Sequence, residues 1–258
     1  MALRLSTALR NSLLQNTSLK GALQNGIMEI YSGSQPASAD AAVIGTLLAT
    51  VTKASGARTA EVLATGTVTL ATGAAGSVNT VTVGGVNIIP QGAIAFNTSL
   101  TQTAADLATA INKGLSSPEY TASSSGAVVT IQAMPGSGTS ANTLTVTATL
   151  TTITATYGNT SGGVDAVNGL SFNNAASGTI DKNSAETWTA VVATSGTAGW
   201  FRFKGSIADA GATDSTGIYI RMDGAIATSG AEYNVSSTTL TAAATHTVST
   251  FPITQPAS

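Results

Sequence analysis

The sequence predicts a mainly β fold: an antiparallel, jelly-roll-like β-sandwich with a short N-terminal helix and an inserted small α+β domain that carries one helix. Two observations favour this class. Short segments that alternate apolar and polar residues recur about every 8–12 residues, with Gly, Pro, Asn or Ser between them, which is typical of sandwiches and jelly rolls. The composition is 43% hydrophobic but only 9% charged, so Ser, Thr, Asn and Gly take surface positions that Lys and Glu usually occupy. Such a surface either suits contacts with other proteins, because neutral hydroxyls can be buried without the desolvation cost of a charge, or is simply typical of a Thr-rich β protein.

The N-terminal segment predicts a helix at residues 6–15. Ser6 or Thr7 can cap its first turn, and a short second turn is expected at residues 19–24, closed by an Asn-Gly pair. The first helix either plugs the sandwich or serves as an arm that reaches a neighbouring protein. The apolar residues that recur in it at helical spacing are Leu9, Leu13 and Leu14.

After residue 26 the period of the apolar residues changes to two, which indicates strands. Gly84 and Gly85 predict a tight hairpin, because glycine adopts the positive φ of a primed turn. The segments expected as strands are 27–31, 45–51, 66–70, 80–83, 86–89, 127–133, 144–150, 153–157, 169–172, 186–191, 199–203, 217–222, 225–228, 232–235 and 245–253.

Composition divides the chain into two domains. Charged residues nearly vanish between residues 57 and 167, which indicates an inserted β-rich domain at 57–167 and a discontinuous β-sandwich domain at 1–56 and 168–258. Domain insertions are tolerated at exposed loops whose ends lie close together, so Ala57 and Val167 are expected to be neighbours.

The inserted domain is expected to hold one helix, at about residues 101–113. Thr103 and Asp106 stand in a spacing that resembles a capping box. The apolar stripe of this helix is Ala104, Leu107, Ala108 and Ile111.

Charge and targeting signals exclude several classes of function. The net charge is −2 and no basic cluster occurs, so binding to nucleic acid is not expected. The chain has no cysteine, which excludes disulfides and thiolate sites. Neither the apolar run of a signal peptide nor about 20 continuous apolar residues occur, so we expect a soluble protein made in the cytoplasm, with no membrane partner.

No motif predicts an enzyme, a cofactor or a metal site. The single histidine, His246, lies in an alternating Thr-rich run and is interpreted as a surface residue. The Gly-rich loop at 135–140 lacks the lysine of a phosphate-binding loop. Asp209, Asp214 and Asp223 lack the spacing of a calcium loop and are interpreted as solubilising loop residues.

A few large apolar residues are candidates for core or interface anchors. Trp188 and Trp200 are expected on neighbouring strands, alongside Phe201 and Phe203, where burial of each ring contributes a few kcal/mol. The same rings could anchor an interface, in which Trp is enriched, and the segment after Phe251 is a second candidate arm. The complete set of candidate anchors is Leu9, Leu13, Trp188, Trp200, Phe201, Phe203 and Phe251.

The outer segments, roughly residues 3–52 and 168–255, carry a pattern of short motifs. These motifs are 5–11 (LSTALRN), 27–31 (IMEIY), 34–40 (SQPASAD), 45–49 (GTLLA), 188–190 (WTA), 196–203 (GTAGWFRF), 223–230 (DGAIATSG) and 248–254 (VSTFPIT). Together they resemble a family of tailed-bacteriophage virion structural proteins, some of which are capsid cement (decoration) proteins with a jelly-roll-like fold. Typical members have a short loop where this chain has the insert.

The insert itself resembles a small β-rich module of phage structural proteins, through residues 81–85 (VTVGG), 95–99 (AFNTS) and 104–112 (AADLATAIN). The two resemblances imply a virion protein on the capsid surface, without cofactor or enzymatic activity. Its implied partners are the major capsid protein and copies of itself, in a homo-oligomer. Because extra domains also occur on tail proteins, a tail or head–tail junction component stays open, as does a receptor- or glycan-binding module on the virion surface.

Overall fold

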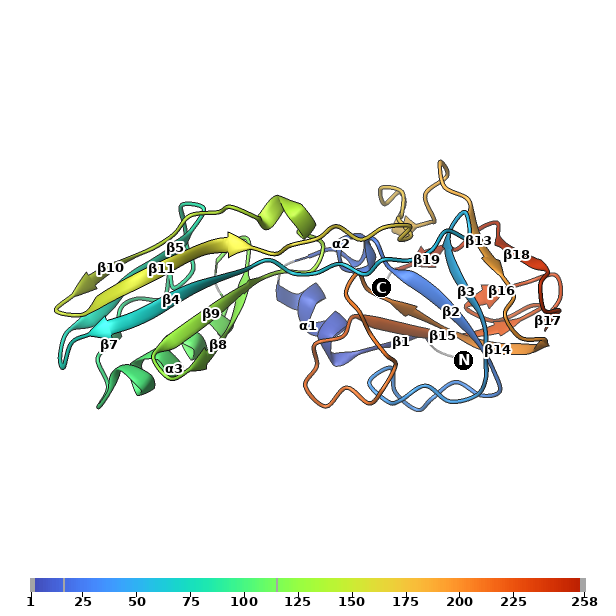
Figure 1. Ribbon diagram of the computed structural model, residues 1–258. Coiled ribbons are helices and arrows are strands. Elements are labelled where there is room, and N and C mark those ends of the chain that lie inside the picture. Colours follow the sequence, from blue (N-terminus) through green and yellow to red (C-terminus); the bar gives the residue numbers. More distant parts are fainter. Residues whose placement is uncertain (1–2, 16, 115, 256–258) are drawn as a thin grey trace. The chain divides into compact units, whose positions relative to one another are not determined.

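The computed structural model describes residues 3–15, 17–114 and 116–255. It is mainly β, with 41% of residues in strands and 12% in helices, and its sheets are antiparallel except for one short parallel pair (Figure 1). The prediction of a mainly β, antiparallel fold is therefore confirmed, and the fold is sandwich-like. No helix among these residues is long and apolar enough to cross a bilayer.

The chain forms two compact units. Unit 1 comprises Met1–Ala60 and Ala166–Ser258, and unit 2 comprises Glu61–Asp165; the sequence placed these boundaries after residues 56 and 167. Within unit 1, Thr59 and Val167 exchange backbone hydrogen bonds of 3.3 and 3.0 Å. Asn168 Nδ2 also donates to the carbonyl oxygen of Ala57 at 2.8 Å. The two ends of unit 1 that flank the insert are thus neighbours.

Unit 1 is built on a nine-stranded sheet whose main path has the order β1-β15-β14-β2-β3-β13-β18. Strand β16 pairs with β15, β17 pairs with β14, and β12 pairs with β19 in a separate two-stranded sheet. Its elements are β1 (Arg4–Leu5), α1 (Thr7–Gln15), α2 (Leu19–Leu23), β2 (Ile27–Ser32), β3 (Leu47–Lys53), β12 (Thr179–Ile180), β13 (Trp188–Val191), β14 (Gly196–Lys204), β15 (Arg221–Ala227), β16 (Tyr233–Asn234), β17 (Thr239–Leu240), β18 (Thr245–Val248) and β19 (Ile253–Thr254).

The central strands of unit 1 are buried on both faces, because β2, β14 and β15 have nearly unbroken burial along their length. Side chains alternate across a strand, so the register separates two layers. One face carries the apolar core, with Phe203 opposite Met222 and Met28. The opposite face carries charge, with Arg202 opposite Asp223 and Glu29.

The apolar core of unit 1 contains half of the Phe, Tyr and Trp rings of the chain. Phe172, Trp188, Phe203 and Phe251 form one aromatic cluster with ring centroids 5.3–6.4 Å apart. Helix α1 contributes Leu9, which is fully buried in this core, while Leu13 packs against it and is partly buried. The helix is therefore packed into the fold, as the plug interpretation expects.

Unit 2 contains two four-stranded sheets and one long helix around its own apolar core. The sheets have the orders β10-β5-β6, with β7 paired to β5, and β11-β4-β9-β8. The elements are β4 (Thr65–Thr72), β5 (Ser77–Val83), β6 (Val86–Asn87), β7 (Ile94–Ala95), α3 (Leu100–Asn112), β8 (Tyr120–Ser125), β9 (Val128–Ala133), a 3-10 turn η1 (Gly138–Ala141), β10 (Val146–Thr151) and β11 (Thr154–Ser161).

Helix α3 matches the expected position, but its cap does not. Ser99 is the N-cap, and its Oγ accepts a hydrogen bond from the backbone N–H of Gln102 at 3.1 Å. Thr103 is buried, and its hydroxyl donates to the carbonyl oxygen of Ser99. The spacing of Thr103 and Asp106 resembled a capping box, but the helix begins one turn earlier.

Other local predictions are also wrong. Residues 169–172 were expected as a strand, but they form only isolated bridges at Leu170 and Phe172. The segments 217–222 and 225–228 were expected as two strands, whereas residues 221–227 form the single strand β15. The Asp-Gly pair at 223–224 resembles a turn in sequence, but Asp223 has a buried partner that keeps the strand extended. Strand β8 was not expected, because its Ser-rich sequence resembles a loop.

Candidate functional site

The most unusual feature of unit 1 is a layer of buried ion pairs on the charged face of its sheet. Arg202 on β14 and Asp223 on β15 are cross-strand partners, and both side chains are fully buried. Arg202 Nε donates to Asp223 Oδ1 and Nη2 donates to Oδ2, each at 2.7 Å. This two-point geometry satisfies most of the polar atoms that burial removes from water, as a buried ion pair requires.

A second pair lies beside the first. Arg221 on β15 donates from Nε and Nη2 to the two carboxylate oxygens of Asp209, both at 2.6 Å. The Arg221 side chain is fully buried and that of Asp209 nearly so. The guanidinium of Arg221 also lies 5.0 Å from the ring centroid of Tyr219. Cation and ring therefore stack within the same layer.

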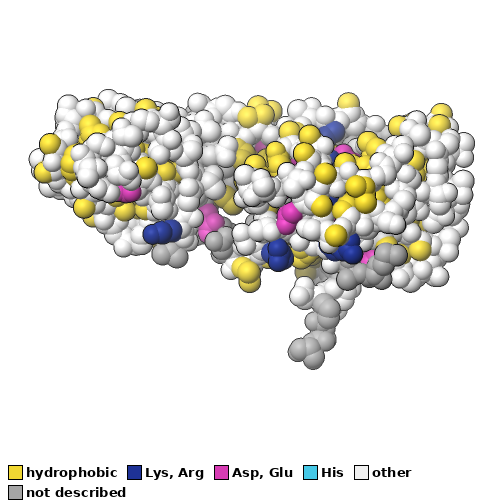
Figure 2. Space-filling view, turned by 90° about the horizontal axis from the view of Figure 1, so that it is seen from below, with side chains coloured by type: hydrophobic (Ala, Val, Ile, Leu, Met, Phe, Trp, Pro, Cys, Tyr) yellow, Lys and Arg dark blue, Asp and Glu magenta, His cyan; other side chains and the backbone are white. Residues whose placement is uncertain are grey.

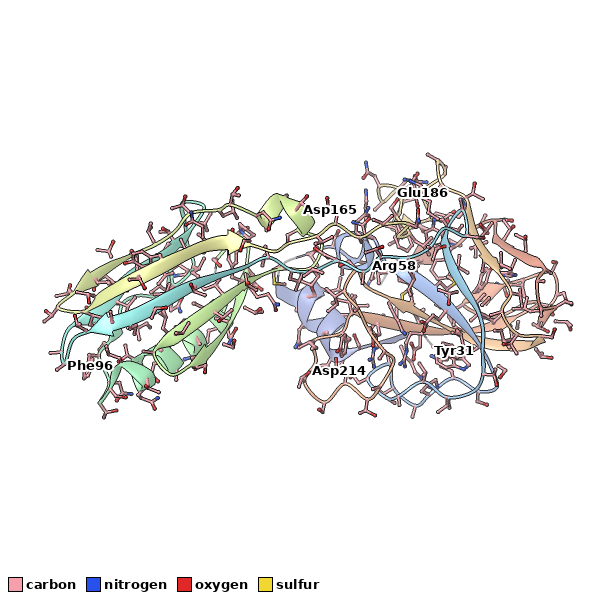
Figure 3. All side chains as sticks on the ribbon, in the orientation of Figure 1. Tyr31, Arg58, Phe96, Asp165, Glu186 and Asp214 are labelled. Atoms are coloured by element: carbon pink, nitrogen blue, oxygen red, sulfur yellow. The ribbon has the colours of Figure 1, made fainter. Side chains whose placement is uncertain are left out.

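The layer continues across β14 to β2. Lys204 Nζ lies 2.7 Å from Glu29 Oε2, and Tyr31 donates its hydroxyl to the same carboxylate. Burial, and then the neighbouring Glu29 carboxylate, raise the pKa of Tyr31, so this hydroxyl stays protonated and donates. The ring of Tyr31 stacks on Trp200 with centroids 4.6 Å apart; Tyr31 is labelled in Figure 3. We name the side chains of Glu29, Tyr31, Trp200, Arg202, Lys204, Asp209, Arg221 and Asp223 the polar layer.

Two long loops, residues 33–46 and 205–220, cover the polar layer, and we name them the cover loops. Arg202 Nη1 donates to the carbonyl oxygen of Ala41 at 3.0 Å, and Arg221 Nη1 donates to that of Ala39 at 3.4 Å. Lys204 Nζ donates to the carbonyl oxygen of Asp209 at 3.0 Å. The cations of the sheet therefore bind the backbone of both loops as well as the carboxylates.

The cover loops also bond to each other and to α1. The backbone N–H of Val43 donates to Gly211 at 2.9 Å, and that of Asp214 donates to Asp40 at 2.7 Å. The Asp40 carboxylate accepts from Thr7 N at 2.9 Å and from its hydroxyl at 2.7 Å. A carboxylate is favourable at a helix N-terminus, so Asp40 joins the first loop to α1.

The interpretation of Asp209, Asp214 and Asp223 as solubilising loop residues is wrong. Asp209 and Asp223 are the anions of the two arginine pairs. Asp214 is buried and accepts hydrogen bonds from the backbone of Thr216, Gly217 and Tyr219 at 2.8–3.0 Å (Figure 3). Sequence spacing could not show this, because the arginine partners lie 12 and 21 residues away on other segments.

This arrangement makes unit 1 sensitive to acid. Burial raises the pKa values of Asp209 and Asp214. The hydrogen bonds and charges around each carboxylate together more than offset this, namely Arg221, the Gly211 amide and Lys204 for Asp209, and the Tyr219, Thr216 and Gly217 donors for Asp214, so both pKa values lie below their usual range. A carboxylate with a depressed folded-state pKa contributes fully to the free energy of unfolding at pH values above its unfolded-state pKa of about 3.9. This contribution is lost as the pH falls through the folded-state pKa.

We therefore expect the contribution of Asp209 and Asp214 to the free energy of unfolding of unit 1 to decrease below about pH 4. Burial raises the pKa of Asp223, so this carboxyl does not add to the acid sensitivity. Trp188 and Trp200, the two tryptophans of the chain, both lie in unit 1, so denaturant titrations followed by tryptophan fluorescence measure it. The variant Asp214→Asn should lose less stability than the parent between about pH 5 and pH 2. Equal losses in the two proteins would contradict the assignment.

The sequence-derived anchors fall on different faces of the sheet. Trp188, Phe201, Phe203 and Phe251 are buried in the apolar core. Trp200 lies in the polar layer instead, with the Arg202 guanidinium 5.6 Å from its ring centroid. The expectation that Trp188 and Trp200 lie on neighbouring strands is wrong, because β2 and β3 separate β14 from β13. Strands β2 and β3, which lie far earlier in the chain, pair between β14 and β13, and local sequence does not reveal this long-range pairing.

The Gly-rich loop at 135–140 has an anion-binding geometry, and a side chain of the protein fills it. Glu61 accepts hydrogen bonds from the backbone N–H groups of Gly136 and Gly138 at 2.6–3.0 Å. Asp165 accepts from Thr139 N at 2.8 Å. Gly138 has a φ of +47°, and a Cβ there would lie 1.9 Å from Asp165 Oδ1. The glycines thus let one loop bind both ends of unit 2.

His246 lies on β18, and its Nε2 is 3.0 Å from the hydroxyl oxygen of Tyr233. Burial lowers the pKa of His246, which favours the neutral ring at neutral pH. The interpretation of His246 as a surface residue needs correction, because the side chain is half-buried and partnered. A tyrosine partner supplies no charge to orient a catalytic imidazole.

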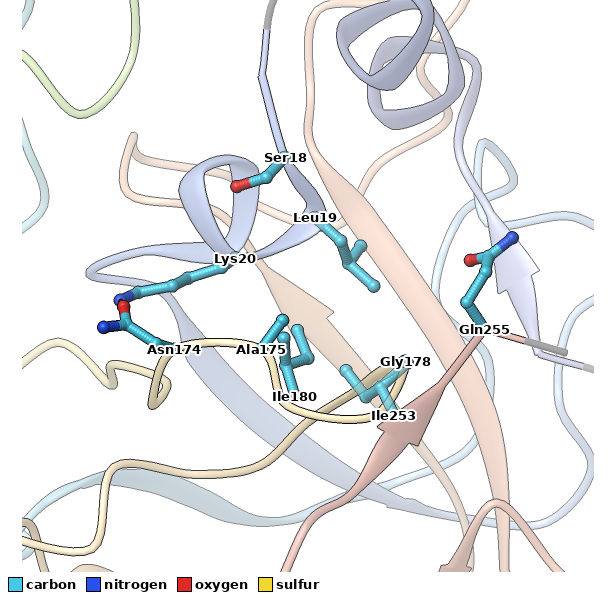
Figure 4. Close-up of a pocket in the computed structure, with 9 residues that line it drawn as sticks. All are labelled: Ser18, Leu19, Lys20, Asn174, Ala175, Gly178, Ile180, Ile253 and Gln255. Atoms are coloured by element: carbon cyan, nitrogen blue, oxygen red, sulfur yellow. The ribbon is translucent and has the colours of Figure 1, made fainter. Parts of the chain in front are cut away.

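A shallow cleft of about 440 Å³ lies between α2, the loop before β12 and β19 (Figure 4). Its apolar lining comes from Leu19, Ile180 and Ile253, and Lys20 Nζ lies at its edge, bonded to Asn174 Oδ1 at 2.7 Å. Within the described ranges, no group of three or more His, Cys, Asp or Glu side chains could hold a metal ion.

Comparisons with protein-family models, with curated proteins and with solved structures find no match to this chain. Sequence reasoning also missed the polar layer. One signal could have indicated it, since residues 201–204 alternate aromatic and basic side chains in a strand that the rest of the fold buries.

Proposed function

We propose that this protein is a capsid decoration protein of a tailed bacteriophage, which binds the assembled head and stabilises the contacts between major capsid subunits. The motif resemblance of residues 3–52 and 168–255 motivates the proposal. The protein would act without a cofactor, through protein–protein contacts with the major capsid protein and with copies of itself.

One structural observation supports this proposal most: the protein buries charge in a chain that has little of it. The sequence has ten Lys and Arg and twelve Asp and Glu among 258 residues. The charged residues that are buried are Glu29, Glu61, Arg202, Lys204, Asp214, Arg221 and Asp223. What remains at the surface is mainly hydroxyl, amide and small apolar groups. Such a surface can be covered by a partner without the desolvation cost of charge, and charge depletion is typical of interface cores.

The mechanism is mass action. A protein that binds only the assembled shell stabilises each site by RT ln(1 + [L]/Kd). Decoration repeats this small contribution over many equivalent sites, so the shell gains stability without any strong single contact. A rigid unit serves this role well, since little conformational entropy is lost when it binds.

The test is the copy number of the protein in purified particles of the phage that encodes it, measured by quantitative mass spectrometry against the major capsid protein. We expect a ratio near one copy per capsid subunit, or a simple fraction of it that amounts to hundreds per particle. Copies on the order of a few dozen or fewer would contradict decoration and would assign the protein to the tail or the head–tail junction. A particle protein of known stoichiometry, such as the portal, is the internal control.

A further inference from the structure

We infer that the outer surface of the cover loops is the face through which the protein binds the shell, and that it accepts a neutral, largely apolar surface of the major capsid subunit. This inference rests on the proposed function and specifies which part of the protein makes the contact. Its basis is the orientation of the charged side chains in the two loops.

The cover loops contain three carboxylates, and each has partners within unit 1. Asp40 binds the first residue of α1, Asp209 pairs with Arg221, and Asp214 binds the backbone of its own loop. The exposed side chains of the loops are instead small or apolar: Ser34, Ala37, Ile44, Thr46, Ala208, Ala210, Ala212, Thr213, Ser215, Thr216 and Ile218. Ile44 and Ile218 are 49% and 55% exposed. Figure 2 views the side of unit 1 that carries the loops; hydrophobic side chains gather on it, with a few Lys, Arg, Asp and Glu side chains among and beside them.

Side chains of the underlying sheet also hold the cover loops in place, which is uncommon for surface loops of this length. Arg202 and Arg221 donate to the carbonyl oxygens of Ala41 and Ala39, and Arg4 Nη1 donates to that of Pro36. The ion pairs that hold the guanidinium groups of Arg202 and Arg221 are buried and bidentate. An ordered apolar surface loses little entropy when a partner covers it.

The chemistry of this face selects its partner. A nucleic acid or an anionic membrane would need a cluster of free cations at the surface. Three of the cations that bond to the loops, Arg202, Lys204 and Arg221, are buried and paired with carboxylates. Arg4 and Arg58 are half-buried, and their guanidinium groups donate to the carbonyl oxygens of Pro36 and Ser206 in the loops. A charged protein surface would lose its hydration against this face without gaining an opposite charge. A neutral protein surface has no charges whose hydration would be lost. In the proposed function, the partner with such a surface is the capsid shell.

The experiment measures binding of the full-length protein to purified heads that lack it, by co-sedimentation over a range of protein concentrations. The test variants are Ile44→Glu and Ala210→Glu, which place a carboxylate on each cover loop. The matched control is Val191→Glu, which places the same charge on β13, at a side chain that is 58% exposed and outside the loops. Circular dichroism and thermal unfolding establish that each variant is folded.

We expect each cover-loop variant to weaken binding by at least tenfold, because the new carboxylate must be desolvated in the interface, while Val191→Glu binds like the parent. If the parent binds heads and both cover-loop variants bind equally well, the cover loops are not the surface that contacts the shell. The proposal that the protein decorates the head would still stand. Failure of the parent to bind heads would overturn decoration and the docking face together. If sedimentation velocity shows that the cover-loop variants instead dissociate an oligomer of the free protein and still bind heads, the face joins copies of this chain and the inference is wrong.

Discussion

Replacing Asp223 with alanine is expected to lower the free energy of unfolding of unit 1 by about 3–5 kcal/mol, since removal of one partner leaves a buried charge uncompensated. The charge that remains is Arg202, whose side chain is fully buried. The carboxylate receives two hydrogen bonds of 2.7 Å from that guanidinium, and the variant loses both. Urea titrations followed by tryptophan fluorescence report this loss, because both tryptophans lie in unit 1.

The matched control removes both charges together. Arg202→Met with Asp223→Leu should cost much less than Asp223→Ala alone, since an apolar pair of similar volume avoids the buried unpaired cation. The double variant should still lose the hydrogen bond from Arg202 to Ala41 and so loosen the first cover loop, which hydrogen exchange of residues 33–46 would detect. If Asp223→Ala lowers the free energy of unfolding by less than about 1 kcal/mol, Arg202 is not left as a buried, uncompensated charge, which would contradict this prediction.

Replacing Trp188 with alanine is expected to destabilise unit 1 by about 3–5 kcal/mol, the range for removal of a large ring from a packed core. The side chain is 0% exposed and contacts Phe172, Phe203 and Phe251 at centroid distances of 5.3–6.0 Å. Its Nε1 also donates to Glu186 Oε2 at 3.1 Å, and this bond would be lost; Glu186 is labelled in Figure 3. Trp200 remains as the fluorescent reporter in this variant.

The control for this variant lies on the same strand. Val191→Ala truncates a side chain that is 58% exposed and should change the free energy of unfolding by no more than about 0.5 kcal/mol. Similar losses in the two variants would mean that the effect comes from strand β13 itself, and would contradict the assignment of Trp188 to the core.

The two predictions bear on the proposed function from opposite faces of one sheet. Trp188 stabilises the apolar core, whereas the Arg202–Asp223 pair stabilises the layer beneath the cover loops. Loss of Trp188 should weaken head binding only through the fraction of folded protein. Loss of the ion pair should also weaken binding by folded molecules, because the docking face would no longer be ordered in advance.

Some features of this protein follow from the sequence alone. The period of two, punctuated by Gly and Asn, predicted a mainly β antiparallel protein, and the structure confirms it. Helix α3 was also predictable, because its apolar residues repeat at helical spacing within a short window. Features of this kind depend on residues within a few positions of each other, and local sequence contains that information.

The tertiary structure alone decided which partner each buried polar group has. Alternation along β14 separates Phe201 and Phe203 from Trp200, Arg202 and Lys204, but it does not tell which segment covers the second set. The cover comes from far along the chain: Arg202 binds Ala41 across 161 positions, and Arg221 binds Ala39 across 182. For the same reason the Asp-Gly pair of β15 resembled a turn. A charged residue is typical of the surface unless a buried opposite charge faces it, and only the folded chain brings that opposite charge within hydrogen-bonding distance.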